Sequence, residues 1–456
     1  MPIPSDIDIS NGPGVELSPT ADRTQAASAP LLDLCRGPAA LFTLPRESFP
    51  ARDMPSYLQF STHSCAAARV HTASVSGSSS GHVRAHGSGL SSSDAVIPAI
   101  AEALERYCSS IYSESGFVTA SAEELGQGAL DLDTVAAVSA NEAAHPKCPI
   151  KKPSKQEVIR WVPGVSLTDR RAMLIPAVMV YSRLSMLLPG ERFWLPISTG
   201  CAAHTDLGLA IRAGLFEVAE RDAISLTWLQ QLQLPQIELD QVPEDLSPHV
   251  ECYRRASIDM EFHFYDATTD IGIPVVYGIR VATQSASAHT MVACSASPRY
   301  SEAIAKVMRD LVTVAPISEK PRDVPANLDD FAQMFHGVTY MARRENAHAF
   351  NFLLKNGKYV ALSRVQRCGA ENRSLQDVLE TLHHKNISVY AVDLTTDEAR
   401  RVGMRVVRVI VPSLQPLSFS YTAQFKGNPR LYAGPSAMGY RTSGEDGLNS
   451  WPQPFA

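Results

Sequence analysis

The chain has 456 residues, of which 45% are hydrophobic and 19% are charged, and its 41 basic and 47 acidic residues give a formal net charge of −6. This balance is typical of a globular protein long enough to bury a sizeable core, in one large domain or several smaller ones. The slight acidity argues against nucleic acid as a partner, because phosphate binding requires a basic surface.

The cysteines indicate a protein of a reducing compartment, and the apolar stretches indicate that the chain does not span a membrane. The eight cysteines form no CxxC pair, so the sequence offers neither a zinc-ligand spacing nor a dithiol motif. The first residues, MPIPSDIDIS, lack the positive and apolar regions of a secretory signal. The most apolar stretch, residues 172–189, is interrupted by Pro176 and Arg183, which argues against a membrane span. We therefore expect a cytoplasmic protein.

The N-terminal third contains two segments of low complexity. Residues 1–30 are rich in Ser, Pro, Thr, Ala and Asp without a hydrophobic period, and we expect a disordered tail. No long linker divides residues 31–456, which we interpret as one domain. Within it, residues 73–93 read ASVSGSSSGHVRAHGSGLSSS. Their composition favours a linker, and the alternative is a loop whose small residues let backbone N–H groups approach a ligand.

A first helix is predicted to begin near Asp94, which is a good N-cap residue. Pro98 would fall in or near its first turn, where the missing N–H costs little. Glu102 and Glu105 are three residues apart and would lie on one flank of this helix. The apolar residues that recur at helical spacing, and are expected to form one buried stripe, are Ile97, Ile100, Ala101, Leu104, Cys108 and Ile111.

A second helix is predicted after Asp206, through LGLAIRAGLFEVAERDAISLTWL. One broad stripe of this helix comprises Leu209, Ala213, Phe216, Glu220 and Ile224, with Glu217 at its edge. The opposite side is also apolar, so we expect the helix to be buried. Buried carboxylates must be paired with a cation or bind a metal. The sequence leaves both solutions open: neutralisation by Arg212 or Arg221, or a divalent cation.

The rest of the chain alternates short helices and strands without a regular βαβ period. We expect strand, turn and strand within 261–282, a helix at 301–313, a strand at 387–392, a short helix at 397–402 and a strand at 405–411. This pattern predicts the α+β class: a large mixed domain in which the carboxylate-bearing helices pack on β-sheets.

Both predicted helices carry the motif Glu-x-x-Glu-Arg, at 102–106 and at 217–221, and each copy follows a run of small residues. One copy is a weak signal, whereas two copies after such runs are more specific. Four converging carboxylates, those of Glu102, Glu105, Glu217 and Glu220, would suit Mg²⁺, which prefers oxygen ligands. The sequence has no GxxxxGK[ST], GxGxxG or HExxH motif, so a nucleotide would be bound through metal and carboxylates.

These residues carry a resemblance to a known family. HGSGLSSSDAVIPAIAEALERYC and PISTGCAAHTDLGLAIRAGLFEVAERDA resemble the two glutamate signatures of the YcaO superfamily, and the endings RLYAGPSAMGYR and NSWPQPFA are also similar. The likeness extends from about residue 31 to the end and is greatest to cyclodehydratases that form azolines in ribosomal peptides. It implies an enzyme that uses ATP and Mg²⁺ to phosphorylate a backbone amide oxygen, so that Cys, Ser or Thr of a precursor peptide cyclises to thiazoline or oxazoline.

The resemblance also implies roles for individual residues. The expected Mg²⁺ ligands are Glu102, Glu105, Glu217 and Glu220, and the expected nucleotide contacts are Ser88, Thr205, Arg221, Glu102 and Glu217. Arg106 either matches Arg221 in role or is structural. Pro452 and Pro454, in the Pro-rich tail 449–456, are expected to lie near the active site, whereas a frayed end is the ordinary expectation for a terminus.

Five positions depart from the family pattern. Ser88 stands where many members have Lys, Pro98 where a Ser is usual, Thr205 where Asn is common, Leu209 where Glu or Gln is common, and Ala456 where the ending has a third Pro. These departures motivate an alternative, a degenerate scaffold subunit without ATP turnover. Two further alternatives keep the chemistry but change the nucleophile, giving a thioamide or an amidine.

The resemblance implies partners as well as residues. The precursor peptide is the substrate, and a separate E1-like protein is expected to bind its leader. A flavin-dependent azoline dehydrogenase would be a further chain. Cys201 lies beside the second motif, and we expect it to be a small packing residue, because thiol reactivity requires electropositive surroundings.

Overall fold

In the computed structural model, the described residues are 30–36, 40–42, 46–48, 61–72, 79–90, 92–256, 260–282, 289–313, 323–367 and 373–455. The predicted disordered tail lies outside them except for its last residue, and so does Ala456. The helices of the described part are α2 Ser92–Cys108, α3 Ala122–Leu125, α4 Ala140–Ala144, α5 Ala177–Val180, α6 Leu207–Gln230, α7 Ser247–Ala256, α8 Tyr300–Thr313, α10 Met334–Met341, α11 Asn351–Leu354, α12 Leu362–Arg367, α13 Leu375–His384, α14 Asp397–Arg401 and α15 Arg430–Ala437.

The described strands form three sheets, and all pairs are antiparallel except β12 with β8. The small sheet comprises β1 Arg46–Ser48, β2 Ser61–Thr72 and β3 Ser79–Gly89. The second has the order β11 Thr290–Ala296, β10 Val275–Ala282, β9 Met260–Asp266, β8 Gln236–Glu238 and β12 Tyr359–Ala361. The third has the order β4 Val118–Ala120, β5 Ile159–Ser166, β13 Tyr390–Asp393, β14 Arg405–Ile410 and β7 Cys201–His204, with β6 Arg171–Pro176 also on β5. This is the predicted α+β class.

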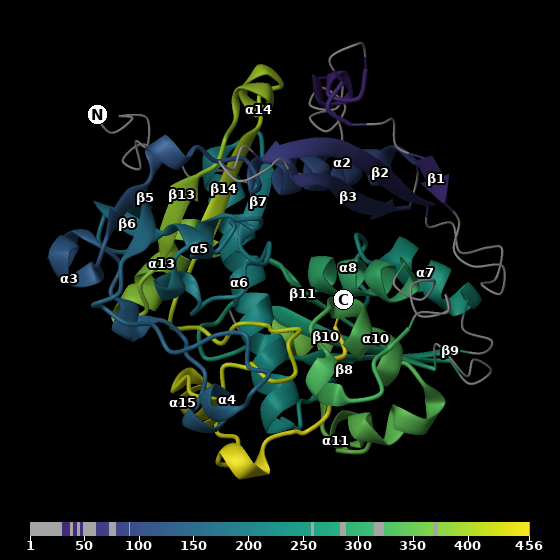
Figure 1. Cartoon of the computed structure of the whole chain (residues 1–456). Coiled ribbons are helices and arrows are strands. Elements are labelled where there is room, and N and C mark those ends of the chain that lie inside the picture. Colours follow the sequence, from purple (N-terminus) through teal and green to yellow (C-terminus); the bar gives the residue numbers. More distant parts are fainter. Residues whose placement is uncertain are drawn as a thin grey trace.

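Helix α6 passes between the two larger sheets (Figure 1). It begins as predicted, because the Asp206 carboxylate accepts a hydrogen bond from the backbone N–H of Leu209 at 2.8 Å. One part of the helix packs on β14 and β7, and another part contacts β11 and β10 of the neighbouring sheet. Every residue from Asp222 to Gln230 is buried. The prediction of a buried second helix is therefore confirmed, although Ala213 of its expected stripe is exposed.

The linker predicted within 73–93 is wrong for Ser79–Gly89, which is strand β3, paired with β2 and packed on α2. Residues 73–78 lie outside the described part. The small residues serve a close contact between strand and helix: a Cβ at Gly87 would lie 2.0 Å from the carbonyl oxygen of Ala95 and 2.5 Å from the backbone nitrogen of Ala99. Low complexity here reflects close packing.

The same contact shifts the buried face of α2. The helix begins at Ser92, and Pro98 is exposed. Its fully buried residues are Ala95, Ala99, Ile100, Ala103, Leu104 and Cys108. Three members of the predicted stripe, Ile97, Ala101 and Ile111, are only partly buried. Alanine positions occupy part of the buried face because β3 leaves room for small side chains only.

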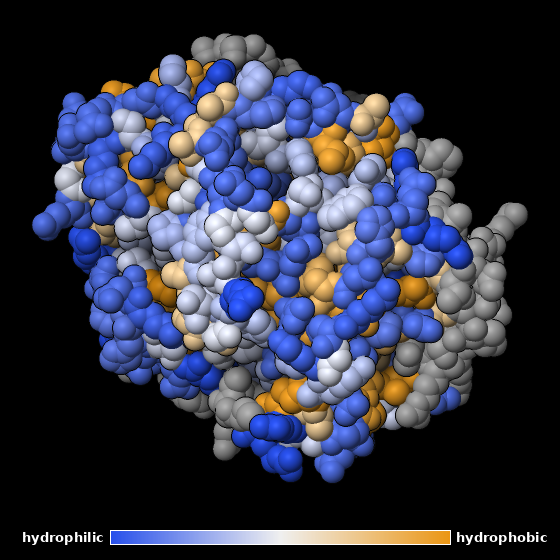
Figure 2. Space-filling model, turned by 90° about the horizontal axis from the view of Figure 1, so that it is seen from below, coloured by the Kyte–Doolittle hydropathy of each residue, from blue (hydrophilic) through white to orange (hydrophobic). Residues whose placement is uncertain are grey.

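The later predictions largely hold. Strands β9 and β10, helix α8, helix α14 and strand β14 lie where the pattern places them, and β13 begins at Tyr390 rather than at residue 387. None of the described helices is both long and apolar enough to cross a membrane. The face in Figure 2 is mostly hydrophilic, and its hydrophobic patches are small and separate.

Candidate functional site

The two helices that carry the Glu-x-x-Glu-Arg motifs, α2 and α6, both contact strand β7. Cys201 is the first residue of β7. Burial is the main cause that raises its pKa to about 11, and the charges of Glu105 and Glu217 raise it further, against the opposing charge of Arg408. Carboxylates from helices more than a hundred residues apart therefore act on the same buried thiol.

The second glutamate pair is fixed by backbone amides and by Arg221. Glu217 accepts hydrogen bonds from the backbone N–H of Gly200 at 2.9 Å and from Arg221 Nη2 at 3.2 Å. Glu220 accepts from Arg221 Nη1 at 2.8 Å and from the backbone N–H of Ala296, at the end of β11, at 3.0 Å. Of the two cations that the sequence suggested, Arg221 is the one that pairs with these carboxylates.

Gly200 can reach Glu217 because of its unusual backbone. Its φ of +86° lies in the left-handed region that favours glycine, and a Cβ there would lie 2.2 Å from the carbonyl oxygen of Val409. The loop before β7 therefore packs against β14 and directs its N–H to the carboxylate.

The first pair is held less completely. Glu102 forms an ion pair with Arg106 at 2.5 Å. Within the part of the chain that the structure describes, the Glu105 carboxylate has no hydrogen bond and no ion pair at contact distance. Burial, followed by repulsion from Glu217 and from Glu102, raises its pKa well above the ordinary value, and Arg106 and Arg408 only partly oppose this.

The half-buried Glu105 differs in this from three carboxylates that are buried. Glu191 accepts from Arg160 at 2.7 Å, Glu142 accepts from three backbone N–H groups, and Asp222 pairs with Arg430 at 2.8 Å. The cost of burying these three charges is offset by direct partners. The Glu105 carboxylate has no such partner among the described residues, and the negative charges of Glu217 and Glu102 act on it.

Helix α8 adds two charged residues that the sequence reasoning missed. The charge of Glu220 is the main reason why the pKa of Lys306 is raised. Burial raises the pKa of Asp310 to about 6, Lys306 and Arg309 oppose the shift, and Glu220 adds to it. Lys306 is exposed and Asp310 half-buried. A Lys and an Asp four residues apart are ordinary on a solvated helix face, so the sequence carries no specific signal for them.

Arg408 is the third missed residue, and here a signal exists. It is a buried cation in the middle of the apolar strand RVVRVI. Its guanidinium donates to the carbonyl oxygen of Met179 at 3.1 Å and to Cys201 Sγ at 3.1 Å. A charged residue inside an otherwise apolar strand requires a partner, and this could have drawn attention to position 408.

A pocket lies beside the second pair. Its walls are mostly apolar, and the residues that line it include Met179, Trp194, Val218, Arg221 and Arg408. Within the described residues, no group of three carboxylate, thiol or imidazole side chains is arranged to hold a metal ion. In this structure three of the four motif carboxylates form ion pairs with arginines. Arg106 pairs with Glu102, and Arg221 pairs with both glutamates of the second motif.

The structure does not link the other predicted nucleotide contacts, Ser88 and Thr205, to the motif carboxylates by any hydrogen bond among the described residues. Ser88 is half-buried in β3, and Thr205 is exposed directly before α6. Among the described residues, neither side chain hydrogen-bonds a motif glutamate. Leu209 is half-buried near the start of α6, so its side chain offers only apolar contact there.

The C-terminal tail is buried rather than frayed. Pro452 and Pro454 are buried, and Trp228 Nε1 of α6 donates to the carbonyl oxygen of Trp451 at 3.1 Å. The Phe455 ring meets the Tyr277 ring edge-on at 5.1 Å. Tyr277 lies directly opposite Cys294 on β11, the strand whose last residue donates to Glu220.

Cys201 is expected to be chemically inert, as its sequence context suggested. Its side chain is 3% exposed, and its raised pKa leaves almost no thiolate at neutral pH. Iodoacetamide treatment of the native protein, followed by mass spectrometry, should leave this thiol unmodified while the unfolded chain reacts. Rapid native alkylation at Cys201 would contradict the prediction, and the less buried Cys148 is the internal comparison.

The chain was compared with known proteins. Residues 86–415 match the family model described as YcaO cyclodehydratase, ATP- and Mg²⁺-binding. No curated protein matches the chain by sequence.

Several solved structures share the fold. A heterocyclase in complex with substrate and cofactor aligns with a TM-score of 0.74 at 20% identity, over 93% of this chain and 57% of that one. YcaO from Methanopyrus kandleri, bound with AMPPCP and Mg²⁺, aligns with a TM-score of 0.58 at 16% identity, over 86% and 90%. The E. coli microcin synthetase McbBCD complex with pro-MccB17 bound aligns with a TM-score of 0.61 at 17% identity, over 90% and 96%. The chain spans little more than half of the first of these.

Proposed function

This chain belongs to the YcaO family of cyclodehydratases, which bind ATP and Mg²⁺, and we propose that it uses ATP to form azoline rings in a ribosomal precursor peptide. The observation that carries the proposal is the Glu105 carboxylate, which is repelled by Glu217 and Glu102 and has no direct partner among the described residues. An enzyme whose site is completed by a divalent cation would have such a carboxylate.

The donor set fits Mg²⁺, because oxygen ligands from carboxylates are those that this ion prefers. We propose that Glu102, Glu105, Glu217 and Glu220 hold the metal, with Glu102 and Glu217 also near the nucleotide. When bound, the metal would offset the charge of the phosphates. Arg221 pairs with both glutamates of the second motif, and it would contact phosphate once the cation neutralises them.

For this reaction the protein must mainly position the reactants and neutralise the negative charge of the phosphates. The side chain of a Cys, Ser or Thr of the peptide attacks the preceding carbonyl carbon, and the former carbonyl oxygen takes the γ-phosphoryl group of ATP. The C–O bond then breaks and phosphate leaves, the amide nitrogen and the attacking side chain lose their protons, and a C=N bond forms in the ring; ADP is the other product. Lys306 and Arg221 supply cations beside the carboxylates, and the apolar pocket excludes water from part of the site.

Four further roles belong to the proposal. Ser88 and Thr205 would provide polar contacts to the nucleotide, and Pro452 and Pro454 would stiffen the tail that packs on β10. A separate E1-like protein would bring the precursor, since the McbBCD neighbour is a complex with pro-MccB17 bound. Oxidation of the azolines would be carried out by a flavin-dependent dehydrogenase on another chain.

The proposal is tested by calorimetric titration of ATP into the protein with and without Mg²⁺. We expect Mg²⁺-dependent binding by the wild type and a loss of affinity of at least about a hundredfold in Glu220→Gln, since even indirect metal partners are worth about ten- to a hundredfold. The exposed Glu345, 70% accessible at its side chain, provides the control Glu345→Gln, which should bind as the wild type does.

Two outcomes would contradict the proposal. Absence of ATP binding both in the isolated chain and in the complex with its partner would leave the scaffold alternative. In the reconstituted system, mass spectrometry should record the loss of one water per ring. Exchange of oxygen for sulfur, or addition of an amine, would instead identify thioamide or amidine formation.

A further inference from the structure

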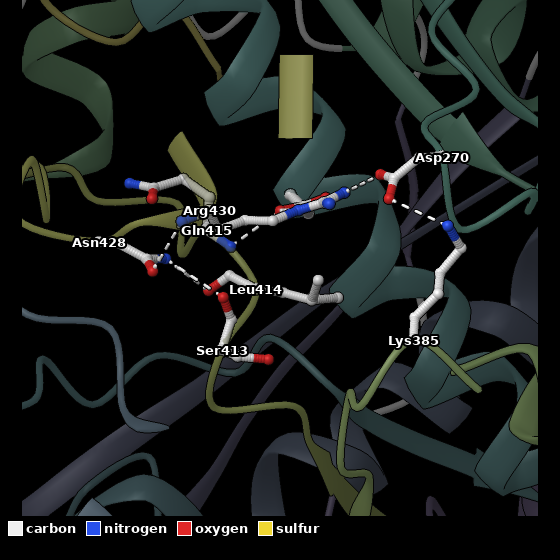
Figure 3. Close-up of polar contacts among 8 residues, drawn as sticks. Asp270, Lys385, Ser413, Leu414, Gln415, Asn428 and Arg430 are labelled. Carbon is white, nitrogen blue, oxygen red and sulfur yellow. Dashed lines mark hydrogen bonds and ion pairs between the residues drawn. The ribbon is translucent and has the colours of Figure 1, made fainter. Parts of the chain in front are cut away.

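A second network of charges lies next to the motif, on the other side of Arg221. Asp222 follows Arg221 on α6, and its side chain is completely buried. Arg430, at the start of α15, bridges Asp222 at 2.8 Å and Asp270 at 2.7 Å. Asp270 also pairs with Lys385 at 3.5 Å. Figure 3 shows Arg430 extended toward Asp270, with Lys385 reaching Asp270 from the other side.

The network holds a segment of the pocket wall. Asp222 Oδ1 accepts a hydrogen bond from the backbone N–H of Gln415 at 2.8 Å. Gln415 lines the pocket together with Arg221, as do its neighbours Leu414 and Pro416. One carboxylate therefore joins the charge network to the loop that faces the proposed nucleotide site.

Two other contacts fix the same segment. The Asn428 side-chain amide lies 3.4 Å from the carbonyl oxygen of Ser413 and 3.3 Å from that of Leu414 (Figure 3). Ser225, one turn after Asp222 on α6, donates to the carbonyl oxygen of Pro416 at 3.0 Å. The backbone of residues 413–416 is thus tied to α6 and to Asn428, which precedes α15.

The charges of the network favour one position of the segment. A fully buried carboxylate requires direct partners, and Asp222 has the guanidinium of Arg430 and the Gln415 amide. Arg430 is itself 9% exposed and balances two carboxylates, while Lys385 offsets the remaining charge. Displacing the segment would leave a buried charge incompletely paired, so the loop is held in one position.

We propose that Asp222 and Arg430 are positioning residues that hold segment 413–416 against α6 and so fix the wall of the pocket beside Arg221. This inference rests on the proposed ATP-dependent function. Neither residue contacts the nucleotide; both act through the main chain of the segment. Because Asp222 follows Arg221 on α6, neighbouring residues of this helix carry the motif arginine and hold the pocket wall.

The test compares full-length variants in the reconstituted system. Arg430→Met should raise the KM for ATP or lower kcat by between about tenfold and about a hundredfold, since displacements of about 1 Å in a site have effects of that size. Arg430→Lys keeps the charge without the two-pronged contact and should recover part of the loss. Hydrogen exchange of residues 413–417 should become faster in Arg430→Met.

Three variants keep the result interpretable. Asp222→Asn removes the charge that pairs with Arg430, and it serves if Arg430→Met does not fold. Lys385→Met breaks only the solvent-facing end of the network and should leave the ATP parameters unchanged. Arg400→Met removes an arginine of exposed ion pairs far from α6 in sequence, and it should behave as the wild type does.

The outcomes separate this inference from the proposed function. Folded Arg430→Met and Asp222→Asn with wild-type kcat and KM for ATP overturn the inference, even if their thermal stability falls, because a merely structural pair would produce that result. If neither the isolated wild-type protein nor its complex binds ATP, the proposed function is overturned, and the positioning role is overturned with it. Changed ATP parameters together with faster exchange at 413–417 support both.

Discussion

Replacing Glu105 by Gln should abolish Mg²⁺-dependent ATP binding while making the metal-free protein more stable at neutral pH. The two effects have the same cause. The Glu105 carboxylate lies beside Glu217 and Glu102, which makes it a ligand for a cation and, without one, a source of repulsion. We expect the affinity for ATP in the presence of Mg²⁺ to fall by at least about a hundredfold in a calorimetric titration.

The raised pKa of Glu105 determines how the stability difference between Glu105→Gln and the wild type changes with pH. The folded state raises the pKa of Glu105 above its ordinary value of 4.5, so the folded protein keeps this proton at pH values where the unfolded chain has lost it. The stabilising contribution of the group is complete below about pH 4 and is lost as the pH rises through the raised pKa. Gln does not ionise, so the stability of Glu105→Gln relative to the wild type should increase with pH across that window.

Thermal unfolding in metal-free buffer between pH 4 and pH 8 would measure this difference. Glu102→Gln is the matched control, since Glu102 already has Arg106 as a partner and its replacement removes a favourable contact. A Glu105→Gln variant that binds ATP normally would contradict the metal assignment. One that is less stable than the wild type at every pH would contradict the electrostatic description of the site.

Replacing Gly337 by Ala should reduce turnover by at least about tenfold without altering any candidate ligand. Gly337 lies in α10, and a Cβ at this position would lie 2.0 Å from the carbonyl oxygen of Gln453. Both sides of this contact are backbone, so the tail must move. Gln453 lies between Pro452 and Pro454, and the shift would carry Phe455 away from Tyr277 and the sheet that contacts Glu220.

Gly116→Ala is the matched control, because no atom lies within 4 Å of the Cβ it would introduce. Steady-state ATP hydrolysis and ring formation should be unchanged in this variant and reduced in Gly337→Ala. Wild-type turnover in Gly337→Ala, with the folded state confirmed by circular dichroism, would show that the position of the tail does not matter for the reaction. Partial loss in both variants would indicate a general effect of the substitution and would contradict the role of the tail equally.

The candidate site could be predicted from the sequence because its central residues form a local pattern. The carboxylates of each motif are three residues apart, so a helix brings each pair to one flank without help from the rest of the fold. The Asp206 cap and the continuous apolar run predict the position and burial of α6, and both are observed. Helical spacing and capping act over a few residues, and such features survive in almost any tertiary context.

Other parts of the site have no local signal. Lys306 and Asp310 look like an ordinary exposed pair until α8 is placed beside Glu220. Residues 79–89 look like a linker until β2 and α2 pack on them. Small residues have the same composition in a flexible connection and in a tightly packed strand, and only the neighbour distinguishes the two cases.

Local sequence was enough to predict the two motif helices, the Asp206 cap, the two carboxylate pairs and the α+β class, because these follow from the periodicity and chemistry of neighbouring residues; α2, in contrast, begins at Ser92, before the predicted cap Asp94. The tertiary structure alone decided how the charges are shared. It paired Glu217 and Glu220 with Arg221, left Glu105 with repulsive neighbours, and joined Asp222 to Arg430 across 208 positions of the chain. Burial and charge pairing depend on which distant segments meet, and contacts of that kind leave no trace in local spacing.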